Sequence, residues 1–195
     1  MSFTPTRRRL LAASAAAGAA LSCGRIVFAA APLTPACHDG DAPTLAETEG
    51  PFFKPRSPER ADLIEPGMKG RPIVLSGQVL DRGCRPLGHA LVDLWQADDA
   101  GEYDNTGFRL RGHVLTDADG RYRFRTIVPA LYPGRTRHFH VKVQPAGASL
   151  LTTQLYFPNE PMNRRDGLFR RELTLRMDGA DETLAARFDF VVAAR

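Results

Sequence analysis

The chain has 195 residues and a formal net charge of +4 at pH 7. This excess of positive charge is confined to the N-terminus, because four of the 26 basic residues and none of the 22 acidic residues lie in residues 1–31. The remainder is formally neutral, which excludes the basic footprint of a nucleic-acid-binding domain. Residues 32–195 are long enough for one domain with a substantial core, and we expect a single domain there.

Residues 1–31 have the pattern of an export signal. Three arginines at positions 7–9 are followed by an apolar, alanine-rich stretch over residues 10–21 and by small residues that suit cleavage. The paired arginines predict the twin-arginine route, and the stretch is too short and too rich in alanine for a membrane span. A lipoprotein anchored at Cys23 is disfavoured, because Leu21 lies one position off the usual motif. We expect a periplasmic or secreted protein without membrane contact once the signal is removed.

Two cysteines, Cys37 and Cys84, lie outside this signal. In an oxidising compartment they are expected to form a disulfide. Such a bridge would tie an N-terminal arm to the rest of the domain. Two free thiols are the alternative.

The domain is predicted to be all-β. Short segments with alternating apolar residues are separated by turn signals at residues 81–83, 98–101 and 117–120. The predicted strands are residues 73–80, 90–96, 121–126, 137–144, 150–157, 172–177 and 185–192. This spacing predicts a two-sheet β-sandwich of the prealbumin-like kind with long active-site loops and no helical second domain.

Two histidines lie on one predicted strand. Side chains alternate between the faces of a strand, so Phe139, Val141 and Val143 form its core-facing stripe while His138 and His140 share the opposite face. A rise of ~3.3 Å per residue places the two histidine Cα atoms ~6.7 Å apart, a gap that two imidazoles can close around one metal ion. The alternative is a solvated strand face that happens to carry two histidines.

Two tyrosines complete a candidate ligand set. Tyr103 is expected in the loop of residues 97–112, and Tyr132 in the loop that follows residues 128–129. Phenolate and imidazole ligands together suit a ferric ion and fit poorly the thiolate, imidazole and carboxylate set of zinc. The sequence therefore predicts a non-haem Fe(III) centre.

Several short motifs surround these residues between about residues 47 and 158. In chain order they are Glu49-Gly50-Pro51-Phe52-Phe53, Val92-Asp93-Leu94-Trp95-Gln96-Ala97, Leu115-Thr116-Asp117 with Asp119-Gly120, Tyr132-Pro133, Arg135, and Thr153-Gln154-Leu155-Tyr156-Phe157. Taken together and in this order, they resemble the intradiol ring-cleavage dioxygenases, the family of protocatechuate 3,4-dioxygenase and catechol 1,2-dioxygenase.

The resemblance implies a role for each candidate ligand. Tyr103 and His138 would be equatorial ligands of the iron, and Tyr132 and His140 would be axial. The implied substrates are dioxygen and an aromatic 1,2-diol, which binds through both oxygens and displaces Tyr132 before the ring opens between its hydroxylated carbons. Protocatechuate or another substituted catechol is favoured as the diol, and a homo-oligomer or a partner subunit is consistent with the family.

Two further residues receive roles from the resemblance. Arg135 would stabilise negative charge that develops on the substrate ring. Gln154 would orient a ligand or the solvent at the metal, with Tyr156 on the same strand face as its support. Only five residues separate Tyr132 from His138, and Gly134 stands where the protocatechuate enzymes carry a large aromatic residue, so we expect a more open site.

A different reading does not involve catalysis. Residues 77–81 and 116–124 also resemble transthyretin-like sandwiches that only bind a ligand or link other domains. Fold cannot separate the two readings. The four ligands, Arg135 and Gln154 favour the dioxygenase, since a binding module does not need them together.

Overall fold

The computed structural model describes residues 1, 37–38, 42–147, 149–178 and 184–193. Pro32–Arg195 form one compact unit. The predicted export signal lies outside the described residues, apart from Met1. Within the described part of the chain, no helix is long and apolar enough to cross a membrane.

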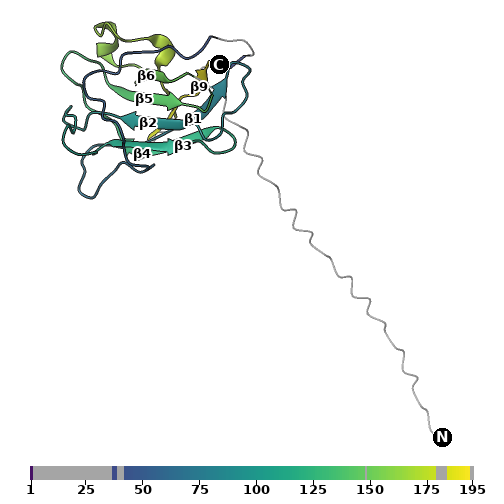
Figure 1. Ribbon diagram of the computed structural model, residues 1–195. Helices are drawn as coiled ribbons and strands as arrows, with labels where there is room; N and C mark the ends of the chain where they lie inside the picture. The colour runs from purple at the N-terminus through teal and green to yellow at the C-terminus, as the bar shows by residue number, and fades with distance from the viewer. Residues whose placement is uncertain (2–36, 39–41, 148, 179–183, 194–195) are drawn as a thin grey trace. The chain divides into compact units, whose positions relative to one another are not determined.

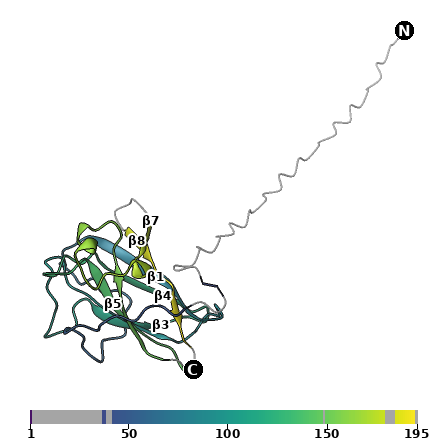
Figure 2. The ribbon, with the colours of Figure 1, turned by 90° about the horizontal axis from the view of Figure 1, so that it is seen from above.

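The described residues form two β-sheets that pack face to face, as the sequence predicted (Figures 1 and 2). One sheet has the order β4 (Arg121–Ile127), β1 (Pro72–Asp81), β8 (Leu184–Arg187) and β7 (Arg176–Asp178), and β9 (Phe190–Val192) pairs with the end of β1. The other sheet has the order β3 (Arg111–Leu115), β2 (Leu91–Trp95), β5 (His138–Gln144) and β6 (Leu151–Tyr156). The helical content of the described residues is two short 3-10 turns, η1 (Pro161–Arg164) and η2 (Arg171–Leu173).

The core lies between the two sheets. Phe139, Val141 and Val143 of β5 all point into it, which confirms the predicted face, and Leu75 and Phe124 approach from the opposite sheet. These side chains are at most 1% exposed. Every second residue of these strands is apolar, and this alternation explains why the apolar side chains point into the core.

Two strand predictions need correction. Strand β3 is not among the predicted strands, and its first two residues lie in the loop predicted over residues 97–112, because polar Arg111 and His113 break the apolar alternation. The predicted strand 172–177 is wrong over its first half: η2 occupies residues Arg171–Leu173, and only Arg176–Asp178 pair as a strand. Leu173 and Leu175 alternate as strand residues would, but Leu173 reaches the core from η2 and Leu175 from the link that follows it.

The predicted strand 185–192 is interrupted. The backbone leaves the regular ladder at Phe188 and Asp189, where Phe188 N–H donates to Ser76 and the Asp189 carboxylate accepts from Gln78 N–H. Gly77 permits this close approach, since a Cβ atom at this position would lie 1.7 Å from the Phe188 carbonyl oxygen. The interruption separates β8 from β9.

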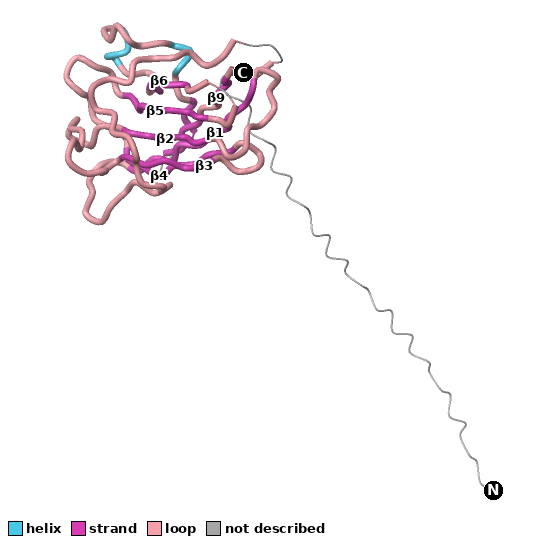
Figure 3. The backbone as a smooth tube through the Cα atoms, in the orientation of Figure 1, coloured by secondary structure: helices cyan, strands magenta, loops and turns pink. Residues whose placement is uncertain are grey.

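Residues 42–53, which we call the N-terminal strap, run from β9, where Thr44 bonds to Val191, past the edge strand β6 to the outer face of the sheet, where Gly50 lies near His140. Glu47 N–H donates to the Thr152 carbonyl, and Thr153 donates its hydroxyl to the Leu45 carbonyl. Before the strap, Cys37 and Cys84 form the predicted disulfide, with Cα atoms 5.7 Å apart. The strap and the long loops, drawn pink in Figure 3, provide a cover for the outer face of the second sheet.

Candidate active site

Strand β5 places both histidines on the outer face of its sheet. Pairing sets His140 between Trp95 of β2 and Gln154 of β6, and His138 opposite Tyr156. Both histidines are buried rather than solvated. The covered position is typical of a functional site, and it removes the alternative of an exposed strand face.

Three candidate ligand atoms converge in this covered space. The Tyr103 hydroxyl lies 3.1 Å from His140 Nε2 and 3.4 Å from His138 Nε2, and the two Nε2 atoms are 3.1 Å apart. Two donors bound at right angles and ~2.1 Å from one ion would lie ~3 Å apart. The three atoms therefore fit a shared metal ion.

Hydrogen bonding fixes the tautomer of His138. Its Nδ1 lies 2.6 Å from the Thr136 carbonyl oxygen, which can only accept, so Nδ1 carries the proton and Nε2 presents a lone pair to Tyr103 and His140. Burial lowers the pKa of His138 to about 4, although the Thr136 carbonyl opposes the shift. A neutral imidazole held in this way is the form that binds metals.

His140 is held by packing instead of by a hydrogen bond. Its ring stacks on Trp95 with centroids 5.0 Å apart and an interplanar angle of 7°. Gly50 of the strap lies against the other side, where a Cβ atom would approach His140 Cε1 to 3.4 Å. Burial lowers the pKa of His140, and the neighbouring His138 and Arg135 lower it further. Its Nδ1 is buried without a partner among the described residues.

Tyr103 is buried under the strap. The ring of Phe52 stacks on it with centroids 4.4 Å apart and an interplanar angle of 16°. Burial raises the pKa of Tyr103 far above its ordinary value, while the positive charges of Arg135 and Arg111 oppose the shift. Ionising this phenol near neutral pH therefore requires a further cation beside it.

Tyr132 lies at the edge of the same cluster. It is half-buried, and its ring meets Tyr103 edge-on at 5.8 Å. Among the described residues, its hydroxyl has no hydrogen bond to the other three ligand atoms. Arg135 N–H donates to the Tyr132 carbonyl across a four-residue turn in which Gly134 has a φ of +78°. Proline followed by glycine suits such a turn, which explains how a short link positions both Tyr132 and Arg135.

Arg135 is oriented by two acceptors. Its Nε donates to Asp166 Oδ2 at 2.9 Å, and its Nη2 donates to Gln154 Oε1 at 2.6 Å. Gln154 is held in turn by the Tyr156 hydroxyl and, through its own Nε2, by the Thr48 carbonyl of the strap. The network joins Arg135 to Gln154, and the Tyr156 hydroxyl donates to Gln154 on the strand face where the sequence placed it.

Sequence reasoning missed Asp166. Its carboxylate is buried and accepts hydrogen bonds from Arg135, Thr136 N–H and Leu168 N–H. Burial by itself raises the pKa of Asp166, but these donors outweigh it and hold the pKa below its usual range. The residue lies 31 positions from Arg135 in an irregular segment, and a turn-like Asp166-Gly167 pair is the one signal that the sequence offers.

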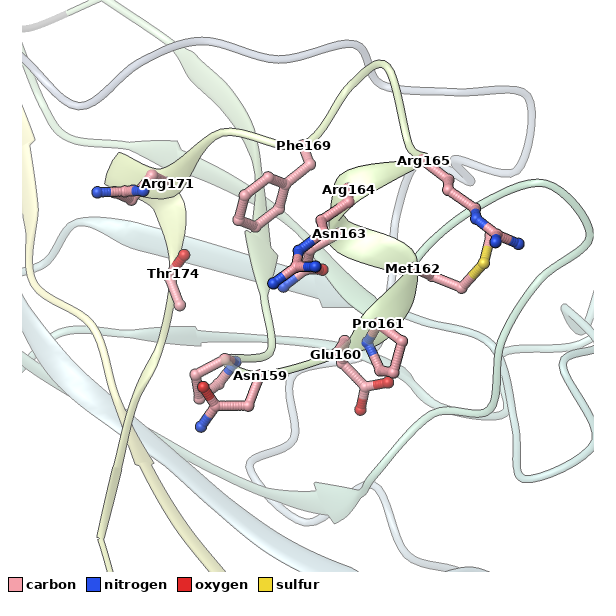
Figure 4. A pocket seen from close by; sticks show the side chains of 11 residues that line it. Asn159, Glu160, Pro161, Met162, Asn163, Arg164, Arg165, Phe169, Arg171 and Thr174 are labelled. Carbon is pink, nitrogen blue, oxygen red and sulfur yellow. The ribbon is translucent and has the colours of Figure 1, made fainter.

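A large open groove lies beside this network (Figure 4). It has a volume of about 910 Å³ and is lined by residues 158–165 together with Phe169, Arg171 and Thr174. None of the candidate ligands lines it. Among the described residues, no group of three or more His, Cys, Asp or Glu side chains could hold a metal ion.

Comparison with known proteins agrees with this architecture. The sequence model of a family described as dioxygenase matches residues 48–194. The chain is 33% identical to the protocatechuate 3,4-dioxygenase beta chain of Burkholderia cepacia, over 84% of this chain and 81% of that protein. It is 32% identical to the hydroxyquinol 1,2-dioxygenase of a Rhizobium species, over 75% of this chain and 55% of that protein.

A solved structure is more similar in sequence. The dioxygenase domain of a dioxygenase and carbohydrate-binding protein fusion from the cellulolytic bacterium Streptomyces sp. SirexAA-E is 51% identical, with a TM-score of 0.76 over 79% of this chain and all of that chain. The fold and the clustered phenols and imidazoles define a β-sandwich oxidoreductase. The chain belongs to the intradiol ring-cleavage dioxygenase family.

Proposed function

We propose that the protein is a non-haem Fe(III) intradiol dioxygenase that cleaves a catechol-type diol with dioxygen. The observation that carries the proposal is the buried convergence of the Tyr103 hydroxyl with Nε2 of His138 and His140, beside Tyr132. These four residues would hold the iron. A transthyretin-like binding module has no use for such a cluster.

Ferric iron would supply the electronic chemistry that lets a catechol react with dioxygen. The protein's own contribution begins with Tyr132, which is half-buried at the edge of the cluster, against the rings of Phe52 and Tyr103. Its phenol oxygen, when ionised, would accept a proton from the arriving diol. Tyr103, His138 and His140 are more deeply buried than Tyr132, so they would keep the geometry of the site.

Arg135 would act on the substrate ring. Asp166 and Gln154 hold its guanidinium from two sides, and its side chain is 19% exposed, so it remains accessible from the site. A fixed positive charge close to the ring stabilises electron density that builds up there during oxygen attack. The strap, through Phe52 and Gly50, would exclude water from the ligand side.

For the diol we propose protocatechuate or another substituted catechol. The relative from Burkholderia supports this choice, as does the space around Gly134, where a Cβ atom would meet nothing within 4 Å. That space would accept a ring substituent. A homo-oligomer or a partner subunit could complete the pocket, and native mass spectrometry would detect either.

We also propose export to the periplasm through the twin-arginine route. The Cys37–Cys84 disulfide supports an oxidising compartment, since such bridges rarely persist in the cytosol. Replacing Arg7 and Arg8 with Lys should leave precursor inside the cell. Unchanged export of the double variant would refute this route.

The activity is tested on the purified mature protein. We expect about one iron per chain, a red-brown colour from tyrosinate-to-iron charge transfer, and intradiol cleavage of diols. Oxygen uptake with product mass spectrometry should show one dioxygen consumed per ring and both oxygen atoms in a muconate-type dicarboxylate. Semialdehyde products of extradiol cleavage, or a colourless protein after growth in iron-rich medium, would refute the proposal.

A further inference from the structure

Arg111 is buried in an unusual way. It is the first residue of β3, its side chain belongs to the largest that are fully buried, and the residue is 1% exposed. Its Nη2 is buried without a hydrogen-bond partner, and no carboxylate among the described residues forms an ion pair with it. A buried guanidinium that lacks a direct ion pair is costly, so its retention requires a reason.

The hydrogen bonds of Arg111 join two segments of the chain. Its Nη1 donates to the Phe52 carbonyl of the strap at 2.6 Å, and its Nε donates to the Asp104 carbonyl at 3.1 Å. Phe52 stacks on the ring of Tyr103, and Asp104 follows Tyr103 in the chain. The two carbonyls therefore bracket Tyr103, and Arg111 fixes both.

The Asp104 carboxylate forms no hydrogen bond with Arg111. It is occupied as the acceptor of a turn, with hydrogen bonds from Thr106 N–H, Gly107 N–H and Arg109 N–H. Burial lowers the pKa of Arg111, and the charges of Asp104, Tyr103 and Asp93 oppose that shift. The turn therefore holds the side chain of Asp104 while Arg111 holds its carbonyl, so the residue that follows Tyr103 is fixed from both sides.

We propose that Arg111 is a positioning residue for the metal centre, which clamps Phe52 and Asp104 around Tyr103. The inference rests on the proposed function, because it requires Tyr103 to be a metal ligand. It assigns to Arg111 no contact with the substrate. The role requires the forked guanidinium, which reaches both backbone carbonyls at once, and a positive charge alone does not fill it.

Three variants separate the effect of the forked guanidinium from that of the positive charge. Arg111→Met removes the charge and the donors at similar length, and Arg111→Lys keeps the charge but not the fork. Arg109→Met is the matched control: Arg109 belongs to the same loop and pairs with Asp98, but its side chain is 46% exposed. If Arg111→Met does not fold, Arg111→Gln takes its place, as a neutral residue that can still donate one hydrogen bond.

The first measurement is the visible spectrum of the iron-loaded proteins. Without the clamp Tyr103 can shift, so Arg111→Met should move the charge-transfer band and weaken iron retention about 10-fold. Arg111→Lys, which cannot reach both carbonyls, should change both properties in the same direction, and Arg109→Met should leave both unchanged. The second measurement is hydrogen exchange of the iron-free proteins, where residues 104–110 should exchange faster in both Arg111 variants.

Each outcome supports or overturns the clamp. An unshifted band with native iron retention in Arg111→Met, or native behaviour of Arg111→Lys, would overturn it. Native exchange rates in residues 104–110 of both Arg111 variants would overturn it as well. A native protein that binds no iron and shows no band would refute the proposed function instead, which is a distinct result from a coloured native protein with indifferent variants.

Discussion

The two faces of β5 are built on different principles. Phe139, Val141 and Val143 face the core, where apolar contacts are numerous and interchangeable. His138 and His140 face outward, where each ring depends on one or two specific neighbours. One strand therefore carries fold stability on one face and chemistry on the other, and a substitution should affect one property without the other.

The outer face also shows how a polar cluster can remain buried. The strap and the loop of Tyr103 cover it, and the network of Arg135, Gln154 and Asp166 satisfies most of its hydrogen bonds internally. Atoms that lack a partner, such as Nδ1 of His140, are concentrated near the ligands. Such unsatisfied groups lower the stability of the protein and are typically retained at functional sites.

The largest expected effect follows from a ligand substitution on the outer face. His140→Ala should reduce iron retention by more than about 100-fold, since even residues that only support a ligand contribute 10-fold to 100-fold. Metal analysis after gel filtration would measure it. Phe139→Leu is the control from the inner face: it should cost about 1–2 kcal/mol of unfolding free energy, less than truncation to Ala, and keep the iron. Equal iron loss in both variants would break the comparison.

The disulfide should act on stability alone. Cys37→Ser combined with Cys84→Ser opens a loop with a sequence separation of 47 residues. The chain-entropy model gives about 4 kcal/mol for a loop of this size. Chemical denaturation with and without reductant would measure the loss in the native protein, and the double variant should be insensitive to reductant. A stability unaffected by reduction would show that the bridge does not constrain the unfolded chain.

Arg135 should affect turnover more than metal binding. Arg135→Ala should keep the iron and lower kcat about 100-fold, the effect of removing one group that stabilises developing charge, which corresponds to about 2.7 kcal/mol. Arg137→Ala is the matched control, because Arg137 is similarly half-buried and pairs with Glu160 away from the ligands. It should change kcat by no more than a few-fold. Full kcat in Arg135→Ala would show that its assigned role is wrong.

Asp166 should produce the smallest effect and a distinct pH dependence. Because its folded pKa is lowered, its ionised form stabilises the protein above the unfolded pKa of ~3.9, and this contribution is lost as the pH falls through the folded pKa. Asp166→Asn should therefore lose about 1–2 kcal/mol of unfolding free energy at neutral pH, and its difference from the native protein should close as the pH falls below ~3.9 and through the lowered folded pKa. Asp62→Asn, which alters an exposed ion pair with Arg125, should change little at either pH. A pH-independent difference for Asp166→Asn would contradict this account.

The sequence predicted the sandwich and most of the site because both depend on local patterns. The alternation of apolar residues identified the core-facing side of β5. The conformation of the Tyr132-Pro133-Gly134-Arg135 turn is set by its own four residues. Strand β3 escaped prediction since its polar residues are buried by distant segments. Its residue Arg111 resembles any surface arginine until the strap is placed over it.

Long-range contacts account for what remained hidden. Asp166 reaches Arg135 across 31 residues, and the strap reaches Gln154 across 106. No periodicity links such segments, because their register is set by the tertiary fold rather than by local backbone geometry. The candidate ligands could be proposed from their motifs, whereas several residues that hold them in place, such as Asp166 and Arg111, could not.

Trp95 gives the protein a built-in optical reporter. It is the only tryptophan of the chain, and its indole lies parallel to the imidazole of His140 at 5.0 Å. Excitation energy in that indole can pass to a coloured centre at the same imidazole, so its emission should dim as iron binds. The decrease in Trp95 fluorescence would then follow iron loading in real time, without substrate and without labelling.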